Sequence, residues 1–268
     1  MEAKTRKITA LIQARLGSSR LPAKTLMTIK GETLLGHLVG RIKASKYVSE
    51  IVIATTTKEI DDAIVRFATD WDIKYYRGSE DDVLDRFYQT ALHYNIETVV
   101  RVTPDCPMLD PKIMDKVISH FLEGNYDYVS NVMPPTYPDG LDTEIFSFDT
   151  LKKGWNAAKL HSEREHVTAF IIKHPKLFRQ FNVKKEGEDL SWMRWTVDTQ
   201  RDFEFVSKIF EKLYIPRKIF YMDDIICLLK ENSELLEINR EIERNEGYRI
   251  SLLKDKEYEK NSYRSSEK

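Results

Sequence analysis

The chain has 268 residues, 41% of them hydrophobic and 32% charged, which suits one large domain or two small ones with a substantial core. Because 42 Lys and Arg residues balance 43 Asp and Glu residues, a general nucleic-acid-binding surface is excluded and any anion site must be local. No stretch approaches the roughly 18 uninterrupted apolar residues of a membrane span, so we expect no membrane insertion. The first residues carry no hydrophobic signal region, and Cys106 and Cys227 lack metal-ligand spacing, so we expect a reducing, cytoplasmic location.

The first half of the chain alternates between short apolar runs and amphipathic segments. A buried strand is predicted at residues 8–14, and further strands at 50–56, 73–78, 98–103 and 126–131, of which 73–78 is the weaker one. Helices are predicted at 32–43, 59–71 and 80–95, and from Asp110-Pro111 onward. This alternation predicts an α/β fold with a mainly parallel sheet and helices on both faces. The loops after the strands then share one carboxyl edge, where open α/β sheets bind ligands.

The second half of the chain is mixed. Strands are predicted at 144–148, 178–184 and 193–199, and helices at 162–175, 200–213 and 221–231. We interpret 132–185 as a small α+β insertion lobe, after which the chain returns to the main sheet near residue 193. Residues 1–248 are predicted to form a single domain. The polar segment 249–268 is predicted to be a frayed C-terminal tail.

The proposed lobe carries three large aromatic side chains, Tyr137, Trp155 and Phe170. These side chains could be buried against a second subunit. Since a twofold dimer is the commonest homo-oligomer, we expect a homodimer.

The stretch LIQARLGSSRLPAKTL carries a cluster of cations and hydroxyl groups directly after the first predicted strand. A phosphate chain needs main-chain and hydroxyl donors and cations at one place. Gly17 allows close backbone approach, Ser18 and Ser19 supply hydroxyl groups, and Arg15 and Lys24 supply charge. The patterns GxxxxGK[ST] and GxGxxG are absent, which disfavours a Walker A loop or a dinucleotide site. We therefore predict phosphate binding, with a solvated basic turn as the open alternative.

Two carboxylates follow predicted strands farther along the chain. Asp105 lies in RVTPDCPMLDP and Asp198 in RWTVDTQRDF. If both reach the carboxyl edge of the sheet, they can share Mg²⁺ beside the basic loop and form a magnesium–triphosphate site. The alternatives are that Asp105 only makes a turn and that Asp198 caps a helix. Asp110 is interpreted as a helix N-cap beside Pro111 rather than as a ligand.

Two acidic and basic segments are candidates for contact with a second substrate. In PDGLDTEIF, Asp142 and Glu144 point to the same side of a strand and could meet a polar ligand or form a solvated acidic edge. In SEREHVTAF, Arg164 could grip a substrate carboxylate beside Glu165 and His166. A structural role for His166 is the alternative.

The segment RGSEDDVLDRF places Arg77, Gly78 and Ser79 just before a predicted helix. These residues could contribute to a nucleotide pocket at the helix N-terminus. The alternative is an ordinary helix entry in which Ser79 is the cap and Asp82 its capping-box partner.

Seven segments resemble one family in order and spacing. The segments are IQARLGSSRLPAKTL, RGSEDDVLDRF, RVTPDCPMLDP, YDYVSN, YPDGLDTEIFSF, REHVT and RWTVDTQRDF. They resemble the CMP-Kdo synthetase-like cytidylyltransferases, in the branch named after the spore-coat polysaccharide biosynthesis protein SpsF, over about residues 8–210. The resemblance implies a nucleotide-diphospho-sugar transferase-like, Rossmann-like α/β fold. It also implies an activity, in which CTP and an acidic sugar give a CMP-sugar and pyrophosphate for surface polysaccharide or glycoconjugate synthesis.

The resemblance also implies roles for individual residues. It implies nucleotide binding by Ala14, Arg15, Gly17, Ser18, Lys24, Arg77, Gly78 and Ser79. It implies acceptor binding by Asp142, Glu144, Arg164, Glu165 and His166. Asp105 and Asp198 would hold Mg²⁺, and the catalytic residues would be Lys24, Arg15 and Asp105. Among the departures from the branch, Ser19 and Ala23 replace the more usual threonine and glycine.

Two other functions stay open at this point. A metal-dependent glycosyltransferase that uses a nucleotide-sugar would share the general fold, but its usual DxD signature is missing. A non-catalytic nucleotide-binding protein is the second alternative. Cations and carboxylates kept at three separate loops argue against it.

Overall fold

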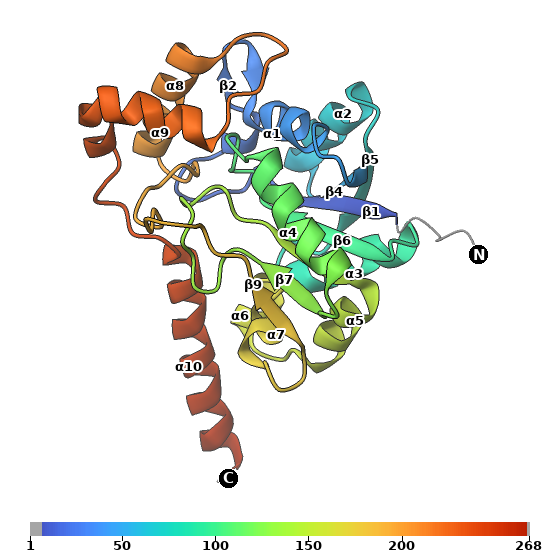
Figure 1. Ribbon diagram of the computed structural model, residues 1–268. Coiled ribbons are helices and arrows are strands. Elements are labelled where there is room, and N and C mark those ends of the chain that lie inside the picture. Colours follow the sequence, from blue (N-terminus) through green and yellow to red (C-terminus); the bar gives the residue numbers. More distant parts are fainter. Residues whose placement is uncertain (1–6, 267–268) are drawn as a thin grey trace.

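A seven-stranded sheet forms the centre of the molecule in the computed structural model, which describes the backbone of residues 7–266 and the side chains of residues 7–256. The strand order is β5-β4-β1-β6-β8-β7-β9, and only β8 runs antiparallel to its neighbours (Figure 1). The strands are β1 (Ile8–Gln13), β4 (Val48–Thr56), β5 (Lys74–Gly78), β6 (Thr98–Val102), β7 (Tyr128–Ser130), β8 (Glu144–Ser147) and β9 (Gln180–Asn182). This arrangement confirms the predicted α/β class with a mainly parallel sheet.

The helices follow the strands along most of the chain. The longer helices are α1 (Leu34–Ile42), α2 (Asp62–Asp70), α3 (Val83–His93), α4 (Pro111–Glu123), α5 (Phe148–Ala157), α6 (His161–Glu165), α7 (Ala169–Lys173), α8 (Gln200–Leu213), α9 (Met222–Glu231) and α10 (Glu246–Ser266). Short 3₁₀ turns are η1 (Lys24–Leu26), η2 (Glu59–Asp61) and η3 (Ser233–Glu237), and β2 (Thr28–Ile29) pairs with β3 (Glu32–Thr33). None of the described helices is both long and apolar enough to cross a membrane.

Strand β1 shows how the sheet is buried on both faces. Its side chains alternate, so Ala10 and Ile12 pack in the cluster that contains Leu38 of α1, while Leu11 packs with Phe87 of α3. All three β1 residues are inaccessible to solvent. Since β1 also pairs with β4 on one side and β6 on the other, the loop after β1 leaves the middle of the carboxyl edge. Ligands bind at such a position in open α/β sheets.

The predicted Asp110 cap is confirmed at the start of α4. Asp110 accepts a hydrogen bond from the main-chain N–H of Lys112 at 2.8 Å, and Pro111 occupies the first helical turn. The second carboxylate oxygen accepts from the N–H of Met222 at 2.7 Å, which ties α4 to α9. Asp110 is therefore a structural residue.

The segment 132–185, expected to be an insertion lobe, contributes β8 and β9 to the main sheet. The helix predicted over 162–175 is interrupted, and α6 and α7 are separate helices. The chain leaves helical geometry at Val167, whose φ is +30° and whose side chain is fully buried. Thr168 then donates a hydrogen bond to Glu144 Oε1 of β8 at 2.6 Å. The helical periodicity of this segment could not show that the chain turns inward to reach the sheet.

The three aromatic residues expected to face a second subunit pack within the chain instead. Tyr137 and Phe170 are buried in core clusters. The Trp155 ring stacks on Tyr88 of α3 at 4.1 Å, and its indole N–H donates to Asp85 at 2.8 Å. The expected homodimer therefore has no support from these side chains.

The strand predicted at 193–199 is wrong. In its place, residues near Arg194 form a single parallel bridge with the loop at Asp139. The N–H of Trp195 donates to the Asp139 carbonyl at 2.7 Å, and the N–H of Asp139 donates to the Met193 carbonyl at 2.9 Å. Trp195 is fully buried among residues of α8 and α9, so the apolar pattern reports burial in a loop rather than a place in the sheet.

The expectation of a frayed C-terminal tail is also wrong, because α10 begins at Glu246 and packs beside α6 (Figure 1). Asp255 accepts a hydrogen bond from the N–H of Ser162 at 2.9 Å. Ser251 lies 3.0 Å from Nε2 of His166. These contacts are made by polar side chains. A polar composition is also typical of a frayed tail, so the sequence did not distinguish a packed helix from one.

Gly140 is required by the close approach of two loops. Its φ is +107°, and a Cβ atom there would lie 2.7 Å from the carbonyl carbon of Trp195. Gly187 has a similar positive φ of +78°, but no atom lies within 4 Å of the corresponding Cβ position. A comparison of alanine substitutions at the two glycines therefore separates the cost of backbone strain from the cost of a steric clash.

We expect Gly140→Ala to lower the free energy of unfolding by about 1–3 kcal/mol through strained φ, and by about 1–3 kcal/mol more through the backbone clash. Gly187→Ala, the matched control, should show only the first effect. Urea unfolding followed by tryptophan fluorescence measures both. Equal losses in the two variants would show that the loops do not need this close approach.

Candidate active site

The side chain of Lys24 joins three separate parts of the chain. It begins η1 after the basic loop and is 8% exposed. Its Nζ donates to Asp105 Oδ2 at 2.9 Å, to Asp198 Oδ1 at 2.6 Å and to the Val197 carbonyl at 2.8 Å. The two predicted metal-binding carboxylates therefore contact the same nitrogen atom.

The charges in this cluster stabilise one another. Burial opposes ionisation of Asp105, but the Lys24 ammonium outweighs it and lowers the pKa of Asp105 to about 2. Burial likewise would lower the pKa of Lys24, yet Asp105 and Asp198 raise it above its usual value. Both groups are consequently charged at neutral pH. A metal ion would find ionised oxygen ligands here.

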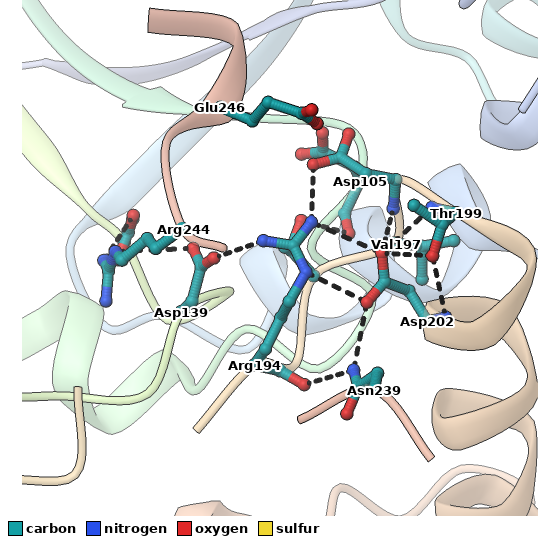
Figure 2. Close-up of polar contacts among 12 residues, drawn as sticks. Asp105, Asp139, Arg194, Val197, Thr199, Asp202, Asn239, Arg244 and Glu246 are labelled. Atoms are coloured by element: carbon teal, nitrogen blue, oxygen red, sulfur yellow. Dashed lines mark hydrogen bonds and ion pairs between the residues drawn. The ribbon is translucent and has the colours of Figure 1, made fainter. Parts of the chain in front are cut away.

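Arg194 holds Asp198 in position, and Figure 2 shows its guanidinium between Asp139 and Asp202. Its guanidinium donates to Asp198 and Asp139 at 2.8 Å each and to Asp202 at 2.9 Å. The N-cap of α8 is Thr199, whose hydroxyl accepts from the N–H of Asp202. The alternative that Asp198 caps the helix is therefore wrong. With that task taken by Thr199, the Asp198 carboxylate is available to Lys24.

The basic loop is fixed by buried polar contacts. Asp61, 1% exposed, accepts a hydrogen bond from the N–H of Leu16 at 2.7 Å. Arg15 forms an ion pair with Glu80 at 3.3 Å. Ala23 has a φ of +56°, a left-handed conformation that glycine adopts more readily than alanine. The loop is thus held open by its neighbours rather than disordered.

Two adjoining cavities meet at the Lys24 cluster. The first, which we call the loop cavity, has a volume of about 590 Å³. Its lining includes Ala14, Arg15, Ser18, Ser19, Lys24, Arg86, Asp105, Glu165, His166 and Asp198. The second, which we call the arginine cavity, has a volume of about 370 Å³. Its lining includes Arg20, Arg101, Asp139, Asp142, Glu144, His166, Arg194 and Arg244, together with Asp105 and Asp198. The shared carboxylates mark the junction between the cavities.

Several residues predicted to bind ligands are engaged elsewhere. Arg77 donates to Asp62 at 2.6 Å and to the carbonyls of Thr56 and Lys58 at 2.8 Å each, and it lines neither cavity. Arg164 donates to Asp82 and, at 2.9 Å, to the Trp155 carbonyl. These arginines hold helices together in the structure. The segments that contain Arg77 and Arg164 resembled ligand sites because a sequence does not show that the two arginines contact acidic residues of other elements.

Three other predicted residues also lie outside the lining of the two cavities. They are Gly17, Gly78 and Ser79. The N-cap of α3 is Asp82, which accepts from the N–H of Asp85 at 2.8 Å, and Ser79 accepts from the N–H of Asp82 at 3.0 Å. The predicted capping box therefore has its residues in the right place but with Asp82 as the cap.

The remaining predicted acceptor residues line the cavities. Asp142 forms a bidentate pair with Arg244 at 2.7 and 2.9 Å. Glu144 is buried and accepts from Tyr128 at 2.6 Å as well as from Arg101 and Thr168. These pairs leave the carboxylates with few free oxygen lone pairs toward the cavity.

His166 is present as a neutral imidazole at neutral pH. Burial lowers its pKa to about 4, and nearby Glu165 only partly offsets this. Its Nε2 contacts Ser251 of α10 at 3.0 Å. The structural role that was left open for His166 is thus visible, although the ring also lines both cavities.

Sequence reasoning missed the arginines that pair with these acids. Arg20 bonds Asp198 at 3.0 Å and Glu246 of α10 at 2.7 Å. Arg194 and Arg101 lie inside motifs that were singled out for their aspartates, so the alternating basic and acidic positions were the available signal. Arg244 follows the predicted domain's last helix and carried no signal, because its partner Asp142 lies far away in sequence.

The comparisons with known proteins identify the family of this chain. Residues 9–250 match a family model described as cytidylyltransferase. The chain is 33% identical to the spore coat polysaccharide biosynthesis protein SpsF of Bacillus subtilis, over 85% of this chain and 95% of that protein. A solved structure of a cytidylyltransferase from Leptospira borgpetersenii superposes with a TM-score of 0.82 at 34% identity, covering 89% of this chain and 99% of that one.

A more distant structure shares the fold. It is that of CMP:2-keto-3-deoxy-manno-octonic acid synthetase complexed with CTP, with a TM-score of 0.59 and 18% identity, covering 78% of this chain and 100% of that one. The sequence resemblance is therefore confirmed by the family model, by SpsF and by solved structures. From the match over most of its length, the chain belongs to the cytidylyltransferase family of nucleotidyl-transferring enzymes.

Proposed function

We propose that the protein transfers the cytidylyl group of CTP to a hydroxyl group of an acidic sugar and releases pyrophosphate. The observation that carries this proposal is the Lys24 ammonium bound to Asp105 and Asp198 at the junction of two cavities. Membership of the family supports nucleotide transfer. Similarity to SpsF supports a product destined for surface polysaccharide or glycoconjugate synthesis.

The loop cavity is suited to the triphosphate. Arg15 and Lys24 supply positive charge, and Ser18 supplies a hydroxyl donor. Ala14 lines the same cavity, and Gly17 keeps the loop free of a side chain close to Glu80. These donors would orient the phosphate chain so that its first phosphorus faces the junction with the arginine cavity.

The two carboxylates fit a magnesium ion. Asp105 and Asp198 offer carboxylate oxygen atoms, the ligand type that Mg²⁺ prefers. No three His, Cys, Asp or Glu side chains among residues 7–256 gather to hold an ion by themselves, so phosphate oxygens and water would complete the coordination. When bound, the ion would neutralise phosphate charge and polarise the phosphorus centre.

The protein contributes to this reaction chiefly by aligning the two substrates and by stabilising the charge on the leaving group. The acceptor hydroxyl oxygen forms a bond to the α-phosphorus and gives up its proton to water. The bond between the α-phosphorus and the oxygen that bridges it to the β-phosphorus breaks, and its electron pair leaves on pyrophosphate. Lys24 and Arg15 stabilise the charge that builds on the leaving group. Holding the two reactants in adjoining cavities supplies the alignment.

The arginine cavity is the place for the acceptor. Arg20, Arg101 and Arg244 line it, and each is paired with a carboxylate of the chain. A substrate carboxylate would take the place of Glu246 at Arg20 or of Asp142 at Arg244, since arginine forms bidentate pairs with such groups. The side chain of Arg164, bound to Asp82, is not part of this proposal.

We expect pyrophosphate release from CTP only when an acidic sugar is present. The measurement is a screen of the four nucleoside triphosphates against a panel of acidic and neutral sugars with Mg²⁺, each nucleotide alone being the control. Release that requires a different nucleotide, or that occurs with neutral sugars alone, would refute the assignment of CTP or of the acidic acceptor respectively.

We expect Asp105→Asn and Asp198→Asn each to lower turnover by about a hundredfold to a thousandfold, because each replaces a carboxylate ligand of the Mg²⁺ ion that would neutralise the reacting phosphate. Asp223→Asn, at an exposed position in the first turn of α9, is the matched control and should keep full activity. Circular dichroism checks that the folds are retained. Wild-type turnover in either folded site variant would contradict the metal assignment.

A further inference from the structure

A buried arginine that the proposed mechanism does not use lines the loop cavity. Arg86 lies in the first turns of α3 and is 2% exposed. The cavity wall that it shares also includes Arg15, Ser18 and Lys24. A buried guanidinium at a cavity wall needs either a counter-charge in the protein or one supplied from outside.

No carboxylate within residues 7–256 forms an ion pair with Arg86. Among the described residues its guanidinium makes one hydrogen bond, from Nη1 to the Ser79 carbonyl, and its Nε has no partner. The other arginines of the two cavities each form an ion pair with a carboxylate; these pairs are Arg15–Glu80, Arg20–Glu246, Arg101–Glu144, Arg194–Asp139 and Arg244–Asp142. Arg86 thus stands apart from its neighbours as a cation without a bonded acid.

The charge of Arg86 is nevertheless retained at neutral pH. Burial, followed by the nearby Arg15 cation, lowers its pKa to about 10. Asp61, Glu80 and Asp82 act on it through space and partly oppose this effect. Two guanidinium groups, those of Arg15 and Arg86, therefore line the same cavity, where they favour a ligand with dense negative charge.

The fold makes room for this side chain. A Cβ atom at Gly78 would lie 3.1 Å from Arg86 Cγ, so the glycine at the end of β5 lets the arginine lie against the strand. The carbonyl of Ser79 accepts the Nη1 hydrogen bond. Gly78 and Ser79, which line neither cavity themselves, can therefore act on a ligand by positioning Arg86.

We propose that Arg86 binds the pyrophosphate portion of CTP, together with Arg15. This inference rests on the proposed function for the identity of the nucleotide. Lys24 is bonded to the two carboxylates that would act on the first phosphate. Arg86 lines the same cavity but, among the described residues, bonds only the Ser79 carbonyl and neither of these carboxylates, so we assign it to the β- and γ-phosphates. Arg86 then stabilises the same group when it leaves.

The test compares the affinity of the wild type and of variants for three probes, inorganic pyrophosphate, CTP and CMP, by isothermal titration calorimetry. Because a hydrogen-bonded charge pair is lost, Arg86→Gln should bind pyrophosphate and CTP about 10- to 100-fold more weakly. Its affinity for CMP should change less than about twofold. Arg86→Lys keeps the charge but loses the guanidinium fork, and we expect a loss of about 3- to 10-fold for pyrophosphate.

The matched control is Arg41→Gln. Arg41 is also buried and donates to the carbonyls of Leu109 and Phe220, but it lines neither cavity. This variant should lower the melting temperature without changing the affinity for pyrophosphate. Circular dichroism establishes that each variant is folded, and Arg86→Lys decides the question if Arg86→Gln is not.

The inference is overturned if a folded Arg86 variant binds pyrophosphate as tightly as the wild type, or if CMP affinity falls as much as CTP affinity. It is equally overturned if wild-type protein does not bind pyrophosphate. Pyrophosphate binding that depends on Arg86, in a protein that releases none from CTP with any acceptor, would instead uphold the anion site and refute the proposed reaction.

Discussion

The ammonium group of Lys24 is the point on which the arrangement of the site depends. It is nearly buried, and its bonds to Asp105, Asp198 and the Val197 carbonyl join the basic loop, the loop after β6 and the segment before α8. Without a cation, two carboxylates this close in a partly buried place would repel each other and favour protonation. Lys24 lowers the pKa of Asp105 and also bonds Asp198, so the protein keeps two carboxylate side chains together beside a phosphate-sized cavity.

The surrounding network has the character of a functional site more than of a stabilising one. Buried ion pairs recover their desolvation cost only when geometry is good and every partner is satisfied. Arg194 meets this condition with three carboxylates, and Asn239 completes it by donating to Asp202 at 3.0 Å (Figure 2). Arg86 does not meet it, because its Nε has no partner among the described residues. A site with one arginine fully paired and another left unpaired is expected where a charged ligand supplies the missing partner.

The sequence was sufficient for the framework of the fold. Apolar runs of strand length alternating with amphipathic segments identified β1, β4 and β6, because the buried parts of these strands are apolar and their composition records that burial. The edge strand β5 is more exposed, and its apolar signal is correspondingly weaker. The placement of Asp105 followed from the end of β6. Asp198 meets it although the strand predicted before Asp198 does not exist, because an extended loop bridged to Asp139 carries it to the same edge.

The sequence was not sufficient to predict which acidic residue each arginine contacts when the two are far apart in the chain. The residues Arg77 and Arg164 have the composition of ligand sites, yet Asp62 and Asp82 bind them from other elements. Arg244 pairs with Asp142 about a hundred residues away, a contact that no local pattern encodes. The helix α10 is held by Asp255 and Ser251, polar residues whose pairing depends on the turn between α6 and α7. Periodicity reports which residues are buried, and it does not report which charges meet.

A crystal structure of the protein with CTP and Mn²⁺ in place of Mg²⁺ tests the central claim most directly. The account predicts an anomalous scattering peak in contact with both Asp105 and Asp198, with the triphosphate extending along Arg15 and Ser18. A nucleotide bound with its phosphates away from this loop, or a metal ion bound to neither carboxylate, would contradict it.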